Sequence, residues 1–197
     1  TLFQPIVMEA AFGTHATDNA LHFLRRTALD SLLLTAIALP GYAISDLVLG
    51  NKQFFIQQTP RFVMLQGFGA MAVLYLTIGV FWSRLRQSPA ILIVLYGLTF
   101  FFANYGPNKT RFVLPSLVFT NCRSTFNGVC AACGKLGALV GASLFAPAAD
   151  HLGDRFVMLL CAVIAVVAFI TTKCFVPQDN EERDERTLSR QISGTIA

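Results

Sequence analysis

Five apolar segments, each long enough for a helix to cross a lipid bilayer, limit what this chain can fold into. A span needs ~20 mostly apolar residues, because the helix must cover ~30 Å of hydrocarbon. Inside the bilayer, the helix also satisfies every backbone polar group internally. The sequence therefore predicts an all-α membrane protein. Its expected spans cover residues 28–50, 62–82, 89–119, 124–149 and 156–176.

Composition agrees with this class and excludes others. Hydrophobic residues make up 54% of the chain and charged residues only 13%, a balance typical of membrane proteins. The net charge of +4 is small, and no Lys/Arg cluster alternates with aromatic residues, so nucleic-acid binding is not indicated. The sequence offers no nucleophile–base pair, phosphate-cradling glycine loop or metal-ligand cluster. We therefore expect neither an enzyme nor a bound cofactor.

The two ends of the chain differ from its apolar centre. Residues 1–27 carry too many charges for a span and predict a loop with a short amphipathic piece. The chain starts at Thr1 without a basic-then-apolar leader, so we expect a piece cut from within a larger protein. Residues 177–197 predict a charged tail, and the distribution of Lys and Arg favours a cytoplasmic side for it. Ser189 and Ser193 each follow an arginine by three positions, a spacing that suits basophilic kinases.

Proline and glycine predict where the spans bend or pack. The third segment is too long for one straight span, so we expect a break at Gly106 and Pro107. Pro40 and Gly41 predict a kink in the first span. The fourth span has small residues four positions apart, a spacing that lets helix backbones approach closely. These residues are Gly128 with Ala132, Gly134 with Ala138, and Gly137 with Gly141.

Polar residues inside the spans point to a binding site. Lys135 lies ~16 Å into the fourth span, and an ionisable residue at that depth is costly and usually functional. The alternative is a buried ion pair, for which this chain has no carboxylate in mid-span. Asn104 and Asn108 are four positions apart, on one helical face beside the expected break. They fit hydrogen bonding between helices, but a cation with two amides also favours an anion site.

These residues resemble those of the phosphate:proton symporters of the major facilitator superfamily. Members carry N-F-G-P-N-x-T-x-F-x-x-P on the tenth helix, a loop ending in R-S-T, and x-x-G-x-x-A-A-x-G-K-x-G-A on the eleventh. The chain reads NYGPNKTRFVLP from Asn104, CRST from Cys122 and NGVCAACGKLGA from Asn127. The resemblance covers nearly the whole chain and is most specific over residues 104–141. It implies a C-terminal fragment with helices eight to twelve of a twelve-helix fold, in which residues 1–27 are the loop after a missing helix seven.

The resemblance implies roles for individual residues. The matching Asn and Lys help bind phosphate in the family, which assigns substrate binding to Asn108 and Lys135, with Asn104 beside them. The family's coupling carboxylates lie on helices outside this chain. Family members carry Gly-Glu in the tenth helix where this chain has Ser116 and Leu117, so Arg123 lacks its usual partner. Asp46 is the candidate replacement in a cytoplasmic ion pair with Arg123.

Three functions remain open from the sequence. The first is uptake of inorganic phosphate with protons at the plasma membrane, by alternating access. The second is transport of another organic anion or a sugar, although a neutral sugar gains little from the charge of Lys135. The third is a phosphate sensor or an inactive truncated product.

Overall fold

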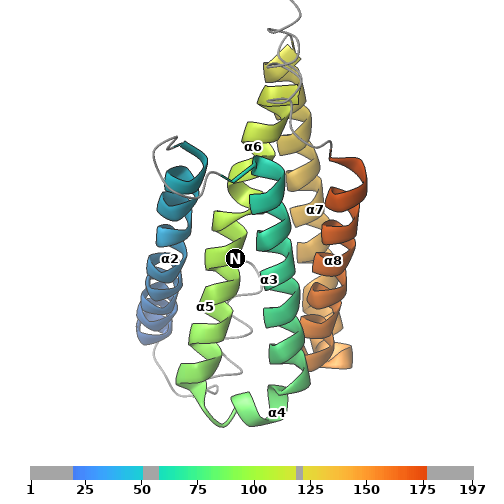
Figure 1. Cartoon of the computed structure of the whole chain (residues 1–197). Helices are drawn as coiled ribbons and strands as arrows, with labels where there is room; N and C mark the ends of the chain where they lie inside the picture. The colour runs from blue at the N-terminus through green and yellow to red at the C-terminus, as the bar shows by residue number, and fades with distance from the viewer. Residues whose placement is uncertain (1–19, 51–57, 119–121, 177–197) are drawn as a thin grey trace, which may run out of the picture.

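The computed structural model describes residues 20–50, 58–118 and 122–176, and every regular element in these ranges is an α-helix. Five helical segments in these ranges are long and apolar enough to cross a membrane: 31–49, 60–80, 90–114, 123–149 and 154–175. The fold of the described residues is thus an all-α bundle with five membrane-spanning helical segments (Figure 1). The helices are α2 Ala20–Gly50, α3 Pro60–Val80, α4 Trp82–Leu85, α5 Pro89–Tyr105, α6 Pro107–Val118, α7 Arg123–Leu152 and α8 Asp154–Phe175.

The first helix differs most from the sequence prediction. α2 begins at Ala20, inside the segment expected to be a loop. It also continues through Pro40 as one helix, at the position where the sequence predicts a kink. The rest of the predicted N-terminal loop, and the predicted tail with Ser189 and Ser193, lie outside the described residues.

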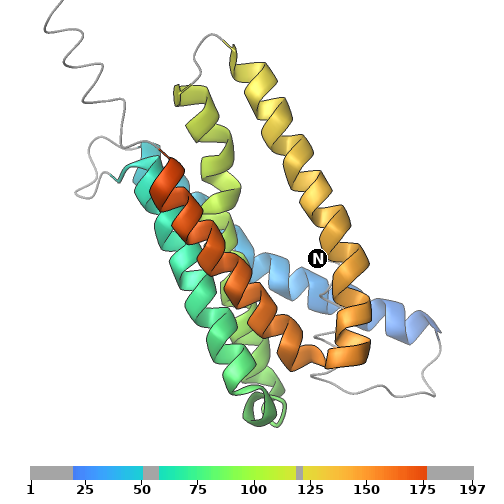
Figure 2. The same ribbon diagram turned by 90° about the vertical axis from the view of Figure 1, so that its right-hand side faces the viewer.

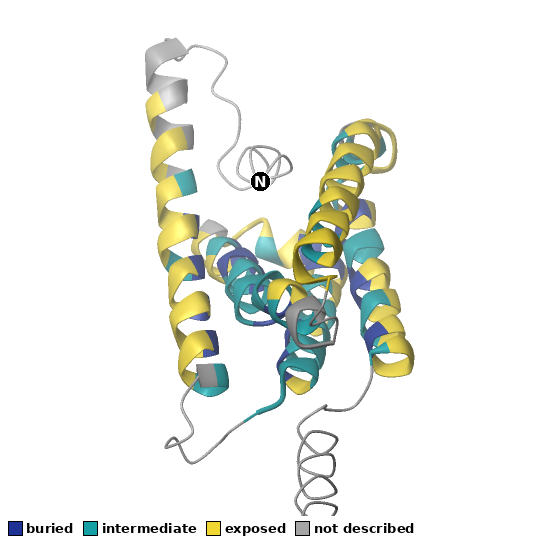
Figure 3. Cartoon of the chain, turned by 90° about the horizontal axis from the view of Figure 1, so that it is seen from above, coloured by how far each residue is buried: buried dark blue, intermediate teal, exposed yellow. Residues whose placement is uncertain are grey.

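Four helices form the packed part of the bundle. α5 packs against α2 on one side and α3 on the other, and α3 packs on α8 (Figure 1). The buried residues of α2 lie on the side turned toward the other helices (Figure 3). α7 instead runs from beside α6 to the foot of α8 and diverges from the other helices between them (Figure 2). One long face of α7 therefore has no neighbouring helix within the described part of the chain.

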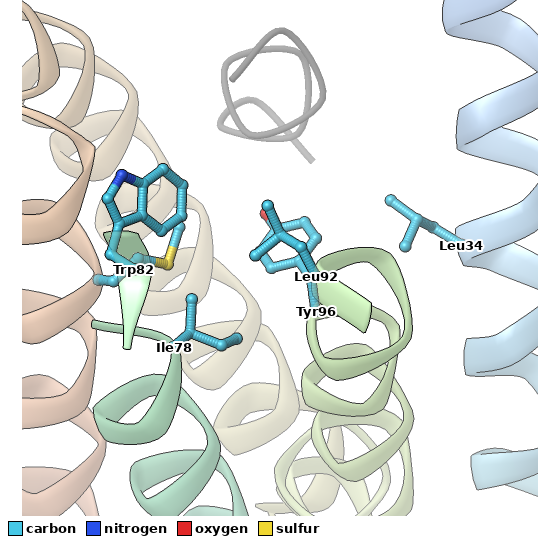
Figure 4. Close-up of a cluster of buried hydrophobic side chains, with 6 residues drawn as sticks. Leu34, Ile78, Trp82, Leu92 and Tyr96 are labelled. Carbon is cyan, nitrogen blue, oxygen red and sulfur yellow. The ribbon is translucent and has the colours of Figure 1, made fainter. Parts of the chain in front are cut away.

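A cluster of buried side chains joins the packed helices near α4 (Figure 4). Tyr96 stacks edge-on against Phe100 at its border, with ring centroids 5.1 Å apart. Lipid is as apolar as these side chains, so inside a bilayer the cluster stabilises the bundle through van der Waals packing. Its members are Leu34, Ile78, Trp82, Leu92, Tyr96 and Met158.

Glycines bring the backbones of neighbouring helices into contact. A Cβ atom at Gly67 of α3 would lie 2.7 Å from Cα of Gly106 and 2.7 Å from Cδ of Pro107. Gly41 of α2 similarly faces the backbone carbonyl of Phe101 in α5. Gly41 thus allows close packing of α2 on α5, a role that the sequence analysis did not assign to it.

The small residues of α7 do not make the close helix contacts expected of them. Among the described residues, nothing lies within 4 Å of a Cβ placed at Gly128 or Gly137. A Cβ at Gly141 would meet only Phe145 of the same helix. A Cβ at Gly134 would meet one atom from another helix, the Nη1 of Arg111, at 3.5 Å. The close approaches in this fold lie on α2, α3 and α5, because those helices have neighbours there.

A polar contact fixes the start of α3 against the end of α8. The Thr59 hydroxyl accepts a hydrogen bond from the Phe62 amide and caps α3, and Pro60 occupies its first turn. Arg61 Nη2 donates a 2.7 Å hydrogen bond to the Lys173 carbonyl in the last turn of α8. A cation there satisfies a carbonyl that the helix itself leaves free.

Candidate functional site

The helix break at Gly106 lies at the centre of the candidate site. α5 ends at Tyr105 and α6 begins at Pro107, so the break falls where the sequence predicted it. Proline has no N–H to continue the helical hydrogen bonding. Beyond the break, the Gly106 carbonyl accepts bonds from both the backbone N–H and the hydroxyl of Thr110, at 3.1 and 2.9 Å. The break is therefore local, and its backbone polar groups remain bonded.

Two amides lie side by side across this break. Asn108 Nδ2 of α6 donates to Asn104 Oδ1 of α5 over 2.8 Å, and Asn104 Nδ2 donates to the Ala38 carbonyl of α2 over 3.1 Å. The sequence predicted the shared face of the two amides but not the bond to α2. A side-chain amide has two N–H donors. Asn108 can therefore donate a second hydrogen bond to a ligand while it holds Asn104.

A second polar cluster ties α5 to α3 beside the break. The Tyr105 hydroxyl lies 2.9 Å from Gln66 Oε1 and 3.3 Å from Gln58 Oε1, and it donates its proton to one of them at a time. The sequence analysis missed this cluster. Its signal was available, since Gln66 is a polar residue within an apolar span. The cluster and the amide pair hold the end of α5 from two sides.

Lys135 lies on α7, the helix that diverges from the bundle. Its side chain is exposed, and no carboxylate pairs with it among the described residues. No hydrogen bond joins it to Asn104 or Asn108 in this part of the chain. The structure thus brings the two amides together and places the lysine on the helix that packs against α6.

Asp46 pairs with a residue that the sequence analysis passed over. The carboxylate of Asp46 in α2 forms a salt bridge with Lys109 of α6, whereas Arg123 begins α7 with an exposed side chain. The expected pair of Asp46 with Arg123 is therefore absent from the described residues. Asp46 pairs with Lys109 because the Lys109 side chain projects from α6 toward α2. Lys109 and Arg111 were both detectable as charges inside the predicted third span.

The salt bridge predicts that removing either charge lowers stability slightly, and that the two losses are not additive. Its side chains are 30% exposed at Lys109 and 61% exposed at Asp46, and exposed pairs contribute ~0.2–1 kcal/mol. Asp46→Asn and Lys109→Gln should each lower the unfolding temperature of the solubilised protein slightly. The double variant should lose less than the sum of the two. Strictly additive losses, with Arg86→Gln as the control, would mean that the pair contributes no stability.

The comparisons with known proteins agree on a transporter class. The family model described as sugar (and other) transporter matches residues 29–184. The chain is 41% identical over 169 residues to the low affinity inorganic phosphate transporter 4 of Lotus japonicus, covering 81% of this chain and 31% of the relative. It is 49% identical over 139 residues to the protein of that name in Medicago truncatula, covering 67% of this chain and 25% of the relative.

A fungal relative has a different named substrate. The glycerophosphoinositol permease 1 of Candida albicans is 32% identical over 163 residues, covering 81% of this chain and 30% of the relative. The chain spans about a third of the length of the curated relatives it matches. No solved structure matches the chain.

Proposed function

Because the chain belongs to the sugar (and other) transporter family of the major facilitator superfamily, we propose that the protein moves inorganic phosphate across a membrane. Uptake is coupled to protons, occurs by alternating access at the plasma membrane, and uses Asn108 and Lys135 to hold the anion. The phosphate transporters of Lotus japonicus and Medicago truncatula, similar along most of this chain, support the substrate.

The amide pair at the helix break is the observation that carries the proposal. Asn108 is held by Asn104 and has a spare N–H, and α6, which bears it, packs against α7, which bears Lys135. Phosphate oxygens accept hydrogen bonds from amides, and an ammonium supplies the opposite charge. A neutral sugar would gain little from that charge. An anion is therefore the substrate that this pair of helices suits best.

The experiment that tests the proposal is uptake of labelled phosphate by vesicles containing the full-length protein. Phosphate should enter faster than into empty vesicles, an inward proton gradient should raise the rate, and a protonophore should abolish that increase. Uptake that ignores the proton gradient would refute coupling alone. Binding of phosphate without any uptake would favour a sensor, and neither binding nor uptake would refute the proposed substrate.

A second candidate substrate is a glycerophosphodiester. The similarity to the Candida albicans permease favours it, because such a substrate also carries a phosphate group for the same amide and lysine. Competition in the vesicle assay separates the two candidates. Glycerophosphoinositol should displace labelled phosphate only weakly if inorganic phosphate is the substrate.

The helix break predicts that removing Pro107 lowers the rate of uptake. Pro107→Ala would restore a backbone N–H and allow α5 and α6 to join, which should straighten the helix. Transport by alternating access needs the helices to move around the bound substrate. We expect a lower maximal uptake rate with a smaller change in affinity for phosphate. Pro40→Ala is the matched control, because α2 continues through Pro40 without a break.

An unchanged rate in Pro107→Ala, at equal abundance, would leave the break as a packing feature only. A rate that falls equally in Pro40→Ala would point to a general effect of losing a proline. Only a loss specific to Pro107 supports bending at this point.

A further inference from the structure

Arg111 places a second cation between α6 and α7. Its Nη1 atom lies 3.5 Å from the position that a Cβ would take at Gly134, the residue directly before Lys135. The guanidinium carbon also lies over the ring of Phe112, 4.6 Å from the centroid. Because Gly134 has no side chain, the guanidinium lies next to α7 at the position directly before the lysine.

The guanidinium extends into the depth of the span. Long side chains on a helix lean toward its N-terminus, which for α6 is the break at Pro107. Gly134 lies about 16 Å along α7 from Arg123 at ~1.5 Å per residue. An arginine that extended to the membrane surface would point away from this position. The location of the guanidinium therefore argues against a role at the level of the lipid headgroups.

Arg111 differs from its neighbour Lys109 in whether a carboxylate neutralises its charge. Lys109 is paired with Asp46, whereas neither Arg111 nor Lys135 has a carboxylate partner among the described residues. Two unpaired cations close together within a span are costly unless an anion joins them. A guanidinium is suited to that anion, because it donates parallel hydrogen bonds to two oxygens of a phosphate.

The position of Arg111 on its helix connects it to the amide pair. Asn108 and Arg111 are three positions apart on α6 and so share one face of that helix, and the hydrogen bond from Asn108 joins this face to Asn104 across the break. Lys109 lies off this face and contacts α2. With Asn104, this face presents two amides and a guanidinium, and the guanidinium reaches toward the helix that carries Lys135.

We propose that Arg111 is a second cationic contact for the transported phosphate and, with Lys135, gives the site its preference for a doubly charged oxyanion. The inference rests on the proposed function, since it concerns the same site. A singly charged phosphodiester would gain less from the pair of cations. Arg111 would thereby contribute to the choice of substrate as well as to affinity.

The test is direct binding of labelled inorganic phosphate to the purified full-length protein in lipid nanodiscs. Arg111→Gln removes the charge and keeps a polar side chain, and it should weaken binding about ten- to a hundred-fold. Arg111→Lys should recover part of the affinity, because it keeps the charge but loses the paired hydrogen bonds. Arg86→Gln, a charge removed from an exposed arginine after α4, should bind as the unaltered protein does.

A competition measurement gives a readout that a merely structural arginine would not change. Dimethyl phosphate, a singly charged diester, should compete poorly with phosphate in the unaltered protein. It should compete relatively better in Arg111→Gln, because that variant has lost the charge that favours the doubly charged anion. A constant ratio of the two affinities, despite weaker binding of both, would refute the role in choice of substrate.

Other outcomes separate this inference from the proposed function. If Lys135→Met abolishes binding while Arg111→Gln binds normally, the phosphate site stands and Arg111 is not part of it. If Arg111→Gln binds phosphate normally but copurifies with less anionic lipid, its partner is a lipid headgroup and the inference is wrong. If the unaltered protein binds phosphate but does not transport it, only the transport proposal fails. If it binds none, both fail.

Discussion

Gly67→Ala should destabilise the protein strongly, because the added methyl group would collide with the helix break itself. The new Cβ would lie 2.7 Å from Cα of Gly106 and 2.7 Å from Cδ of Pro107, and neither a backbone atom nor a proline ring can rotate aside. Overpacking of this kind typically costs ~1–3 kcal/mol. We expect a lower unfolding temperature in detergent and reduced abundance in the membrane.

Gly137→Ala is the matched control for this prediction. Among the described residues, nothing lies within 4 Å of a Cβ at that position. Alanine is also the better helix former by ~1 kcal/mol in an exposed helix interior. Equal losses in both variants would mean that the contact between α3 and the break is not what determines stability. A normal unfolding temperature for Gly67→Ala would show that the helices separate there at little cost.

Lys135→Met should cause the largest loss of phosphate binding. Methionine keeps a long, flexible side chain and removes the charge, so packing should survive. A hydrogen bond to a charged group contributes ~1.5–3 kcal/mol, which corresponds to a ten- to a hundred-fold change in affinity. The measurement is uptake at low phosphate concentration, where the rate follows affinity, with abundance measured in the same membranes.

Lys173→Met is the control for Lys135→Met. It removes the same charge from an exposed position in the last turn of α8, and the backbone carbonyl that Arg61 contacts remains. Uptake should stay normal in the control. Normal low-concentration uptake in Lys135→Met would show that the lysine is not a ligand for phosphate. Loss of uptake in both variants would indicate a general need for positive charge.

The spans and the break could be predicted because they depend on local chemistry. A run of apolar residues must be helical in lipid wherever it lies in the protein. Pro107 cannot donate a hydrogen bond in any context, and it directly follows a glycine, so the sequence predicted the interruption that the structure has at Gly106. Proline alone is not sufficient, since α2 continues through Pro40. The start of α2 could not be predicted in this way. The charges at Arg25 and Arg26 exclude a span but do not exclude a helix that extends beyond the membrane.

The partners of residues on different helices could not be predicted, because they depend on how the helices rotate about their axes. The sequence paired Asp46 with Arg123, and the structure pairs it with Lys109. The small residues of α7 suggested a contact face, but the contacts form at Gly41 and Gly67, whose neighbours are backbone atoms. Glycine spacing indicates that a close approach is possible. Only the arrangement of the helices decides where it occurs.

The contact between Gly67 and Gly106 is a point about which α6 can tilt. Two backbones meet there without side chains between them, and the helical hydrogen bonding is interrupted at the same point. α6 has 12 residues, so it extends ~18 Å beyond this contact. A tilt of about 10° would move its far end by about 3 Å, which is roughly the width of a water molecule. A small rotation at one pair of glycines is thus enough to shift the far end of α6 by about the width of a water molecule.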